Sequence, residues 1–296
     1  MKKKLPDWVG RLPFLPENKI PAIIRPEMEV STIYGTGKQR IRVQKYVSTD
    51  KITCGDFQVP PGGFFDPPDV HPGDEFYYLF QGTAVVFNPQ TGETHTVNEK
   101  EGFLIPGGVW HQVYNFSETN VTILGTIAPA IWSEEDSGSE IEYLEKSNFY
   151  TPGESPLPRL PRSEPLVSTS GMTSISADRQ YHVLLGNESH ALLSLLVNTE
   201  RMQTGILTMA GNSFTTPEIH VGDELIYALE DSMVVKILEQ HKNDRSVSAR
   251  SLEIQKGGKC LIPGGYLHEY YNFNEQPVKA LISIAPNPET TERRVG

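Results

Sequence analysis

A short pattern of histidine, glycine and acidic residues occurs twice in this chain of 296 residues. The two copies read Asp69-Val-His71-Pro-Gly73-Asp-Glu75 and Glu218-Ile-His220-Val-Gly222-Asp-Glu224. Each is followed by a second matching block, Pro106-Gly-Gly108-Val-Trp-His111 in the first half and Pro263-Gly-Gly265-Tyr-Leu-His268 in the second. Because chance rarely produces one spacing twice, the repeat predicts two copies of one structural unit with a shared chemistry.

The spacing between the copies locates one insertion. His71 and His220 differ by 149 positions, whereas His111 and His268 differ by 157. An insertion of eight residues in the second copy accounts for the change. We expect it near residues 239–246, a polar stretch that would lengthen a hairpin loop.

The segments between these landmarks are typical of short β-strands, because they are rich in β-branched and aromatic residues and are bounded by Gly, Pro, Asn and Asp. They include residues 76–80, 83–87, 121–124, 225–229, 233–238 and 278–284. Strands at this regular spacing predict an all-β protein with a sandwich or barrel in each half. Short helices are expected only at residues 134–146 and in the last ten residues.

Composition shifts divide the chain into four parts. Residues 1–45 are interrupted by prolines and form an N-terminal arm that packs either on the other half or on a second subunit. The first barrel is expected at 46–150 and the second at 177–296. Between them, residues 151–176 contain a proline-rich connector.

The acidic and histidine residues have the types that bind divalent metals, but only a folded-back chain can bring them together. In an unbroken strand, residues 69 and 75 would share a face yet lie about 20 Å apart. We therefore expect a turn at Pro72-Gly73-Asp74, with glycine available for a positive φ, and its counterpart at residues 221–223. A similar bend at Pro106-Gly-Gly108 would direct His111 toward the same point.

These residues resemble the two signature motifs of the cupin superfamily, and the doubled set resembles the bicupins. The first motif is matched by His71-x3-Glu75-x6-Gly82 and by His220-x3-Glu224, and the second by Pro106-x-Gly-x2-His111-x3-Asn115 and Pro263-x-Gly-x2-His268-x3-Asn272. The resemblance implies two tandem double-stranded β-helix (jelly-roll) barrels, each with a metal inside. It covers most of residues 45–130 and 195–287.

The chain departs from the family pattern at two places. The leading His of the first motif is Asp69 in one copy and Glu218 in the other, and the final Gly of the motif is Asp231 in the second copy. Asp tolerates a left-handed turn position, so the second change is mild. The carboxylates of Asp69 and Glu218 either complete a metal shell or act as hydrogen-bonding or general-base groups, which makes both candidate catalytic residues.

The expected metal ligands form one set in each half: Asp69, His71, Glu75 and His111, and then Glu218, His220, Glu224 and His268. This mixture of nitrogen and oxygen donors favours Fe(II) or Mn(II), with Zn(II), Ni(II) or Co(II) as further candidates. If the two leading carboxylates turn away, a face of two histidines and one carboxylate remains, which suits oxygen-activating iron. We expect up to two ions per chain.

Two further pairs of repeated residues are expected to be structural. Tyr78 and Tyr227 occupy matching positions and are expected to line the barrels as packing, with proton transfer as the alternative. Asn115 and Asn272 are expected at turns or strand ends.

The composition limits the possible partners and location. A formal charge of -11 repels nucleic acid and anionic lipid surfaces at long range, so neither is expected as a partner. No apolar run reaches the length of about 18 residues that a membrane span needs. The basic start has no apolar stretch after it, so we expect a cytoplasmic protein, with a small-molecule substrate and a homodimer as a further expectation.

Three functions are compatible with this pattern. The first is a metal-dependent oxidoreductase of the dioxygenase type, acting on a small oxygenated organic acid, enol or phenol that chelates the metal. The second is redox-neutral isomerisation, epimerisation or decarboxylation of a sugar or keto acid through a metal-bound enediolate. The third is a bicupin that binds or stores a ligand without catalysis, which would not need two complete ligand sets.

Overall fold

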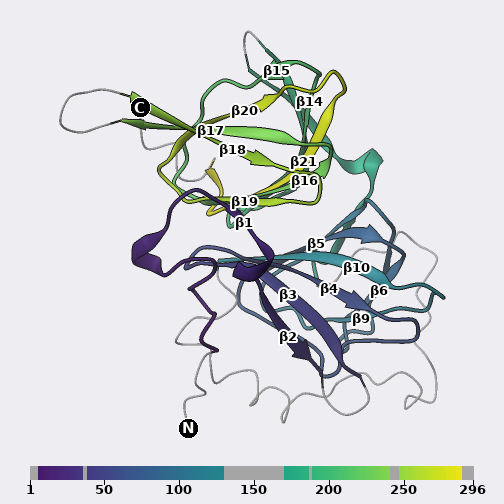
Figure 1. Ribbon diagram of the computed structural model, residues 1–296. Coiled ribbons are helices and arrows are strands. Elements are labelled where there is room, and N and C mark those ends of the chain that lie inside the picture. Colours follow the sequence, from purple (N-terminus) through teal and green to yellow (C-terminus); the bar gives the residue numbers. More distant parts are fainter. Residues whose placement is uncertain (1–5, 36–38, 130–169, 187–188, 241–246, 289–296) are drawn as a thin grey trace, which may run out of the picture. The chain divides into compact units, whose positions relative to one another are not determined.

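The computed structural model describes residues 6–35, 39–129, 170–186, 189–240 and 247–288. The chain forms two compact units (Figure 1), and each is discontinuous in sequence, whereas the barrels were expected at the contiguous ranges 46–150 and 177–296. The first unit contains Met1–Val9, Val30–Lys45 and Cys54–Arg179. The second contains Gly10–Glu29, Tyr46–Thr53 and Gln180–Gly296.

The first unit is built from a seven-stranded and a three-stranded sheet. The larger sheet has the order β11 (Thr173–Ile175), β8 (Gly102–Ile105), β5 (Asp74–Gln81), β10 (Val121–Ala128), β4 (Thr53–Val59), β3 (Ile41–Ser48) and β2 (Val30–Tyr34). The smaller has the order β7 (Thr94–Val97), β6 (Ala84–Phe87) and β9 (Gln112–Tyr114). Since β5 pairs with both β8 and β10, it is a central strand, and its first residues carry Glu75.

The second unit repeats this arrangement. Its larger sheet has the order β1 (Ala22–Ile24), β19 (Lys259–Ile262), β16 (Asp223–Glu230), β21 (Val278–Ala285), β14 (Gln203–Met209), β13 (Ala191–Asn198) and β12 (Tyr181–Leu185). Its smaller sheet has the order β15 (Ser213–Phe214), β20 (Leu267–Asn272), β17 (Met233–Gln240) and β18 (Val247–Ile254). Three short 3₁₀ helices are described: η1 (Pro16–Asn18), η2 (Pro26–Met28) and η3 (Ala177–Arg179).

The matching strand orders confirm the all-β fold with two barrels. They also show where the arm goes, because β1 from the arm takes the edge position beside β19 that β11 takes beside β8 in the first unit. The sequence left open whether the arm packs on the other half of the chain or on a second subunit. Strand β1 of the arm packs on the half that contains the second barrel.

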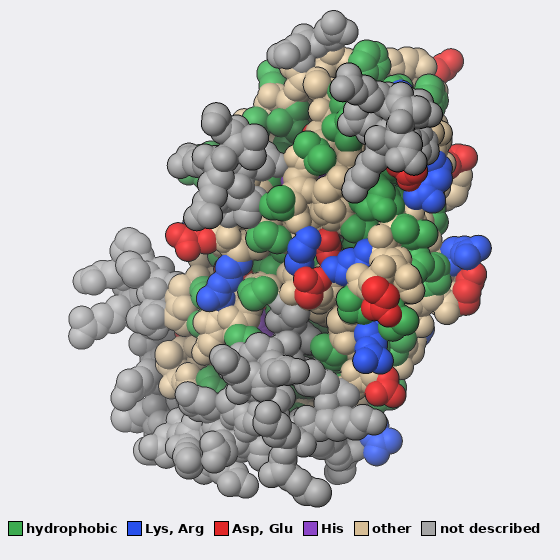
Figure 2. All heavy atoms as spheres, turned by 90° about the vertical axis from the view of Figure 1, so that its left-hand side faces the viewer, with side chains coloured by type: hydrophobic (Ala, Val, Ile, Leu, Met, Phe, Trp, Pro, Cys, Tyr) green, Lys and Arg blue, Asp and Glu red, His purple; other side chains and the backbone are tan. Residues whose placement is uncertain are grey.

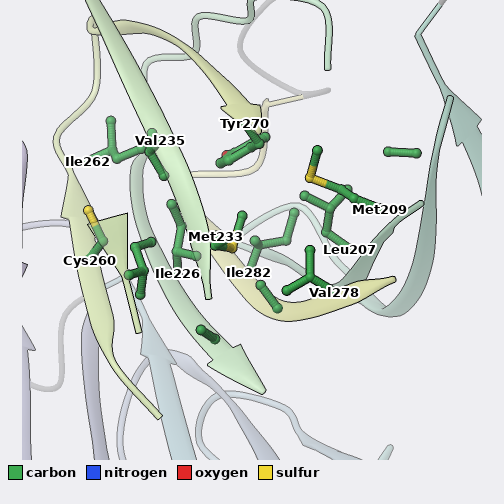
Figure 3. Close-up of a cluster of buried hydrophobic side chains, with 14 of the residues drawn as sticks. Leu207, Met209, Ile226, Met233, Val235, Cys260, Ile262, Tyr270, Val278 and Ile282 are labelled. Atoms are coloured by element: carbon green, nitrogen blue, oxygen red, sulfur yellow. The ribbon is translucent and has the colours of Figure 1, made fainter. Parts of the chain in front are cut away.

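Each barrel encloses its own apolar core, as alternating strands predict. In the second unit, Figure 3 shows side chains from both sheets meeting, among them Ile226 and Ile282 of the larger sheet and Val235 of the smaller, with Tyr270 in the same cluster. The core of the first unit contains Phe57, Tyr77 and further buried residues of the corresponding strands. These cores fix the strands from which the candidate ligands project.

The insertion predicted in the second copy lies in the expected hairpin. Strands β17 and β18 have eight residues each, whereas β6 and β7 have four each. Residues 241–246 between them lie outside the described residues. So do the helices expected at 134–146 and at the C-terminal end beyond residue 288, and most of the proline-rich connector.

Charged side chains of both signs are dispersed over the face that Figure 2 shows. Figure 2 shows a face on which Lys and Arg side chains alternate with Asp and Glu side chains and form no continuous basic patch among the described residues. No helix in the described part of the chain has the length and apolar character that would let it cross a membrane.

Replacing Ile24 by Ala should test whether β1 holds the arm on the second unit. Ile24 is 4% exposed, so its truncation should lower the free energy of unfolding by about 2 kcal/mol or more. The matched control is Ile20→Ala, because Ile20 is 45% exposed and its truncation should cost less than about 1 kcal/mol. Denaturant unfolding measures both, and equal losses would contradict the anchoring role of β1.

Candidate metal centre

An antiparallel bridge between the two motifs forms the base of each site. The Asp69 amide donates to the His111 carbonyl at 2.8 Å, and the His111 amide donates back to Asp69 at 2.9 Å. The same pair joins Glu218 and His268, at 2.8 and 2.9 Å. Residues that are 42 or 50 positions apart in sequence are therefore held opposite one another by the backbone alone.

In the first barrel, a buried carboxylate oxygen faces two imidazoles. Glu75 Oε2 lies 2.9 Å from His71 Nε2 and 2.9 Å from His111 Nε2. Asp69, His71 and His111 each offer one ligand atom within 4.8 Å of the others. His71 and His111 therefore lie near both predicted carboxylates of this set, whereas Glu75 is not part of the group of mutually close ligand atoms that contains Asp69.

The second barrel repeats the geometry. Glu224 Oε2 lies 3.1 Å from His220 Nε2 and 3.1 Å from His268 Nε2, and these three residues form a second group whose ligand atoms lie within 4.8 Å. Glu218 Oε1 is 3.5 Å from His268 Nε2, but its side chain is 42% exposed. Glu218 thus borders the group and is partly open to solvent.

The turns between the ligands use glycine in two ways. Gly108 and Gly265 have positive φ values of 79° and 90°, as expected for the bend before the second histidine. The prediction of a positive φ at Gly73 is wrong. A Cβ there would instead come within 2.6 Å of the Ala128 carbonyl oxygen, and one at Gly222 within 2.7 Å of the Pro286 carbonyl oxygen, so glycine is required for close approach. Asp231 takes the left-handed conformation expected for it, with φ 48°.

Backbone carbonyls set the direction in which the imidazoles face. The Nδ1 atoms of His71 and His111 lie 3.0 Å from the carbonyl oxygens of Gly73 and Val109. In the second barrel the same contacts are 2.9 Å, to Gly222 from His220 and to Tyr266 from His268. Since a carbonyl only accepts, each Nδ1 carries the hydrogen, and a neutral ring then presents the Nε2 lone pair to the carboxylate.

This arrangement fits a divalent cation. Two lone-pair nitrogens and a carboxylate oxygen would repel at 2.9 Å unless a proton or a metal ion lies between them. His111 Nε2 is buried and has no hydrogen-bond partner among the described residues. A set of two imidazoles and one or two carboxylates matches Fe(II), Mn(II) and similar ions.

Protons compete for the same positions in the metal-free chain. Burial alone would lower the pKa of His71, but the charge and hydrogen bond of Glu75 raise it to about 9. Burial would raise the pKa of Glu75, but the two imidazoles lower it to about 2. In the second barrel, burial is likewise outweighed by Glu218 and Glu224, so the pKa of His268 rises to about 10.

In each barrel a second acidic residue links the first motif to the second. The sequence predicted that Asp74 and Asp223 lie in turns but did not predict this role. Gly107 donates its amide to Asp74 Oδ1 at 3.0 Å, and Gly264 donates to Asp223 Oδ1 at 3.0 Å. Asp223 is also paired with Lys19 and Lys51, at 3.1 and 3.2 Å. The repeated Gly-Asp-Glu order in the sequence could have indicated this role. In each barrel the Asp precedes the ligand Glu and binds the glycine turn that precedes the second ligand His.

The tyrosines near the ligands are not the pair that the sequence suggested. Side chains alternate along a strand, so Tyr78 lies on the opposite face of β5 from Glu75 and outside the barrel core. Tyr77 shares the face of Glu75, and its buried hydroxyl has no hydrogen-bond partner among the described residues. In the second barrel Tyr270 reaches the site, with its hydroxyl 2.5 Å from Glu224 Oε1.

The repeated asparagines have the structural role expected for them. Asn115 donates its amide to the carbonyl oxygens of Val59 and Thr119, at 2.8 and 2.7 Å. Asn272 donates to the carbonyl oxygens of Ala210 and Gln276, at 2.8 and 2.9 Å. Both side chains thus close the loop that follows the second motif.

A cavity of about 260 Å³ opens beside the second group. Its polar wall includes Glu218, His220 and Tyr270. Most of the remaining wall is apolar, from residues such as Leu193 and Ile282, and none of the described lining residues is Lys or Arg. The cavity therefore suits a molecule with an apolar body and oxygen atoms at one end.

Comparison with known proteins agrees with this fold. Residues 55–127 match the family described as Cupin domain. The first barrel thus matches the cupin family, and the second repeats its strand order, so the chain has the two-barrel fold of the solved structures to which it is similar. None of the curated proteins compared with the chain matches it.

Solved bicupin structures share the fold at low identity. The oxalate decarboxylase of Lactobacillus farciminis, in its formate complex, is 13% identical, with a TM-score of 0.62 over 92% of this chain and 87% of that one. AerE from Microcystis aeruginosa is 10% identical, with a TM-score of 0.57 over 86% and 97%. A variant of the Bacillus subtilis oxalate decarboxylase is 13% identical, with a TM-score of 0.59 over 91% and 78%.

Metal binding should depend on pH, because the ion displaces protons. A folded-state pKa of about 9 for His71, against an ordinary value of 6.5, stabilises the metal-free fold below about pH 6.5 and loses that contribution as the pH rises through 9. The melting temperature of the metal-free chain should therefore fall from pH 6.5 to 9, while the increase caused by Mn(II) should grow. An Mn(II) shift that shrinks over this range, or that persists in His71→Ala/His220→Ala, would contradict the assignment.

Proposed function

We propose that this bicupin is a metal-dependent enzyme of the dioxygenase type, with one divalent ion held by each of the two ligand sets. Its substrate is a small organic molecule whose oxygen atoms chelate the ion of the second barrel. The cavity beside Glu218 and His220 is the observation that carries this proposal, because it joins an apolar chamber to a group of metal-binding side chains.

The charges around the cavity favour a particular class of substrate. The carboxylates of Glu218 and Glu224 would together balance the charge of a bound divalent ion, and no described lining residue is a Lys or Arg that would offset the charge of a further anion. A small dianion such as oxalate would also leave the apolar wall uncovered. An enol, phenol or diketone that is neutral or singly charged matches both the chelating end and the apolar body.

The residues around the cavity would have different roles according to their position. His220, Glu224 and His268 would hold the ion, which when bound supplies Lewis-acid and redox chemistry. Glu218, partly exposed at the cavity, is placed to take the hydroxyl proton of an enol or phenol. Leu193, Ile282 and their apolar neighbours would contact the apolar body of the substrate.

Redox-neutral chemistry is the second candidate, and the position of Glu218 supports it. A carboxylate at the cavity wall can also take a proton from a carbon next to a carbonyl group. This reaction needs no oxygen and works with metals that do not change oxidation state. Turnover without oxygen, with Mn(II) or Zn(II), would select it over the oxidative proposal.

Oxygen uptake tests the leading proposal directly. The chain is loaded with Fe(II) under anaerobic conditions and mixed with a catechol, an aliphatic β-diketone or oxalate in air-saturated buffer. We expect uptake with an apolar chelator and none with oxalate, in proportion to bound iron. Uptake that is absent with every chelator, or unchanged in the His220→Ala variant, would overturn the assignment to the second barrel.

Replacing Glu218 by Gln should slow turnover more than it weakens metal binding. Loss of a proton acceptor should lower kcat by about a hundredfold or more, because general-base catalysis contributes on this scale. The matched control is Glu230→Gln, an exposed glutamate paired with Lys279 on the same unit, and it should leave kcat unchanged. Metal content is measured in both variants, and a loss of activity that only follows loss of metal would contradict the proton-acceptor role.

A further inference from the structure

The duplicated barrels differ in how a buried phenol reaches the ligand group. In the first barrel Tyr77 lies two residues after Glu75 on β5, and the residue two after His111 is Val113. In the second barrel these types are exchanged: Ile226 follows Glu224 by two residues, and Tyr270 follows His268 by two. Because two residues along a strand return to the same face, both tyrosines point toward the carboxylate, but from different strands.

The exchange gives the two hydroxyls different surroundings. Tyr270 donates to Glu224 Oε1 at 2.5 Å, whereas Tyr77 has a buried hydroxyl with no hydrogen-bond partner among the described residues. Tyr270 is firmly placed, because its backbone exchanges hydrogen bonds with Thr215: the Tyr270 amide donates to Thr215 Oγ1 and the Thr215 amide donates to the Tyr270 carbonyl, both at 2.9 Å.

The two oxygens of Glu224 therefore face different partners. Oε2 lies 3.1 Å from both imidazole nitrogens, and Oε1 receives the phenol. A short hydrogen bond to a charged carboxylate is among the stronger hydrogen bonds in proteins. It fixes the carboxylate plane, so that Oε2 faces the two imidazoles while Oε1 is held by the Tyr270 hydroxyl, which also lies 3.1 Å from His268 Nε2.

We propose that Tyr270 is a positioning residue that restricts Glu224 to a single ligating oxygen and so keeps coordination positions of the second centre open on the cavity side. The inference rests on the proposed metal function and extends it, since it makes the two centres unequal. Burial and the nearby Glu75 carboxylate raise the pKa of Tyr77, but among the described residues its hydroxyl makes no hydrogen bond as short as that of Tyr270, so Glu75 is restrained less and can offer both oxygens to an ion. The second centre, bordered by Tyr270 and the cavity, is then the one that admits a chelating substrate.

Co(II) is a suitable probe, because its visible d–d absorption becomes weaker as its coordination number rises. Each centre is isolated by removing the histidines of the other, with His71→Ala/His111→Ala leaving the second and His220→Ala/His268→Ala leaving the first. Tyr270→Phe is introduced into the former background and Tyr77→Phe into the latter. The absorption spectrum and the Kd for Co(II) are measured for all four proteins.

For the second centre, Tyr270→Phe should raise the Kd for Co(II) about tenfold or more, as loss of a group that orients a ligand does, and should weaken the d–d bands as Glu224 becomes bidentate. For the first centre, Tyr77→Phe should leave the spectrum unchanged and the Kd within about twofold, because an unpartnered hydroxyl has no hydrogen bond to lose. Equal spectra and affinities for Tyr270→Phe and its parent would overturn the proposal.

Two further results keep the interpretation clear. If the parental backgrounds bind no Co(II), the proposed metal function itself fails, independently of Tyr270. If Tyr270→Phe does not fold, Ile226→Tyr/Tyr270→Val copies the arrangement of the first barrel and retains the core volume. That variant should show the same weakened bands, and retention of the parental spectrum would again overturn the proposal.

Discussion

The backbone bridges between residues 69 and 111 and between 218 and 268 are the constraint on which both sites depend. Each bridge fixes the start of one motif against the end of the other. The flanking turns then direct His71 toward His111 in the first barrel and His220 toward His268 in the second. A one-residue slip in either pairing would move the histidine to the other face of its strand. The ligand geometry is therefore a property of the strand register more than of the side chains.

Electrostatics explains why so polar a group can remain inside a barrel. Buried carboxylates and imidazoles are costly unless each is paired, and here every imidazole is held by a carbonyl on one side and faces a carboxylate on the other. Asp74 and Asp223 extend the network to the neighbouring turns. Such a network orients the ligand atoms toward one another. Because protons take the place of the ion in the metal-free chain, the affinity for metal depends on pH.

Duplication has preserved the ligand set while changing its surroundings. Both barrels keep two histidines and a glutamate, with the same spacing inside each motif, yet the phenol comes from β5 in one and from β20 in the other. The edge strand beside the β8 or β19 position also has different origins, from the segment that follows the first barrel and from the N-terminal arm. Divergence of this kind allows two centres of one chain to take different roles.

The sequence by itself determined the all-β class, the two repeats, the eight-residue difference in one hairpin and the eight candidate ligands, because spacing and residue type are local properties. It could not decide that Tyr77 and Tyr270, rather than Tyr78 and Tyr227, approach the carboxylates, since that depends on which face of each strand is turned inward. Nor could it show that Gly73 is needed for space or that β1 completes the second sheet. These features arise from contacts between segments far apart in the chain, which only the tertiary structure brings together.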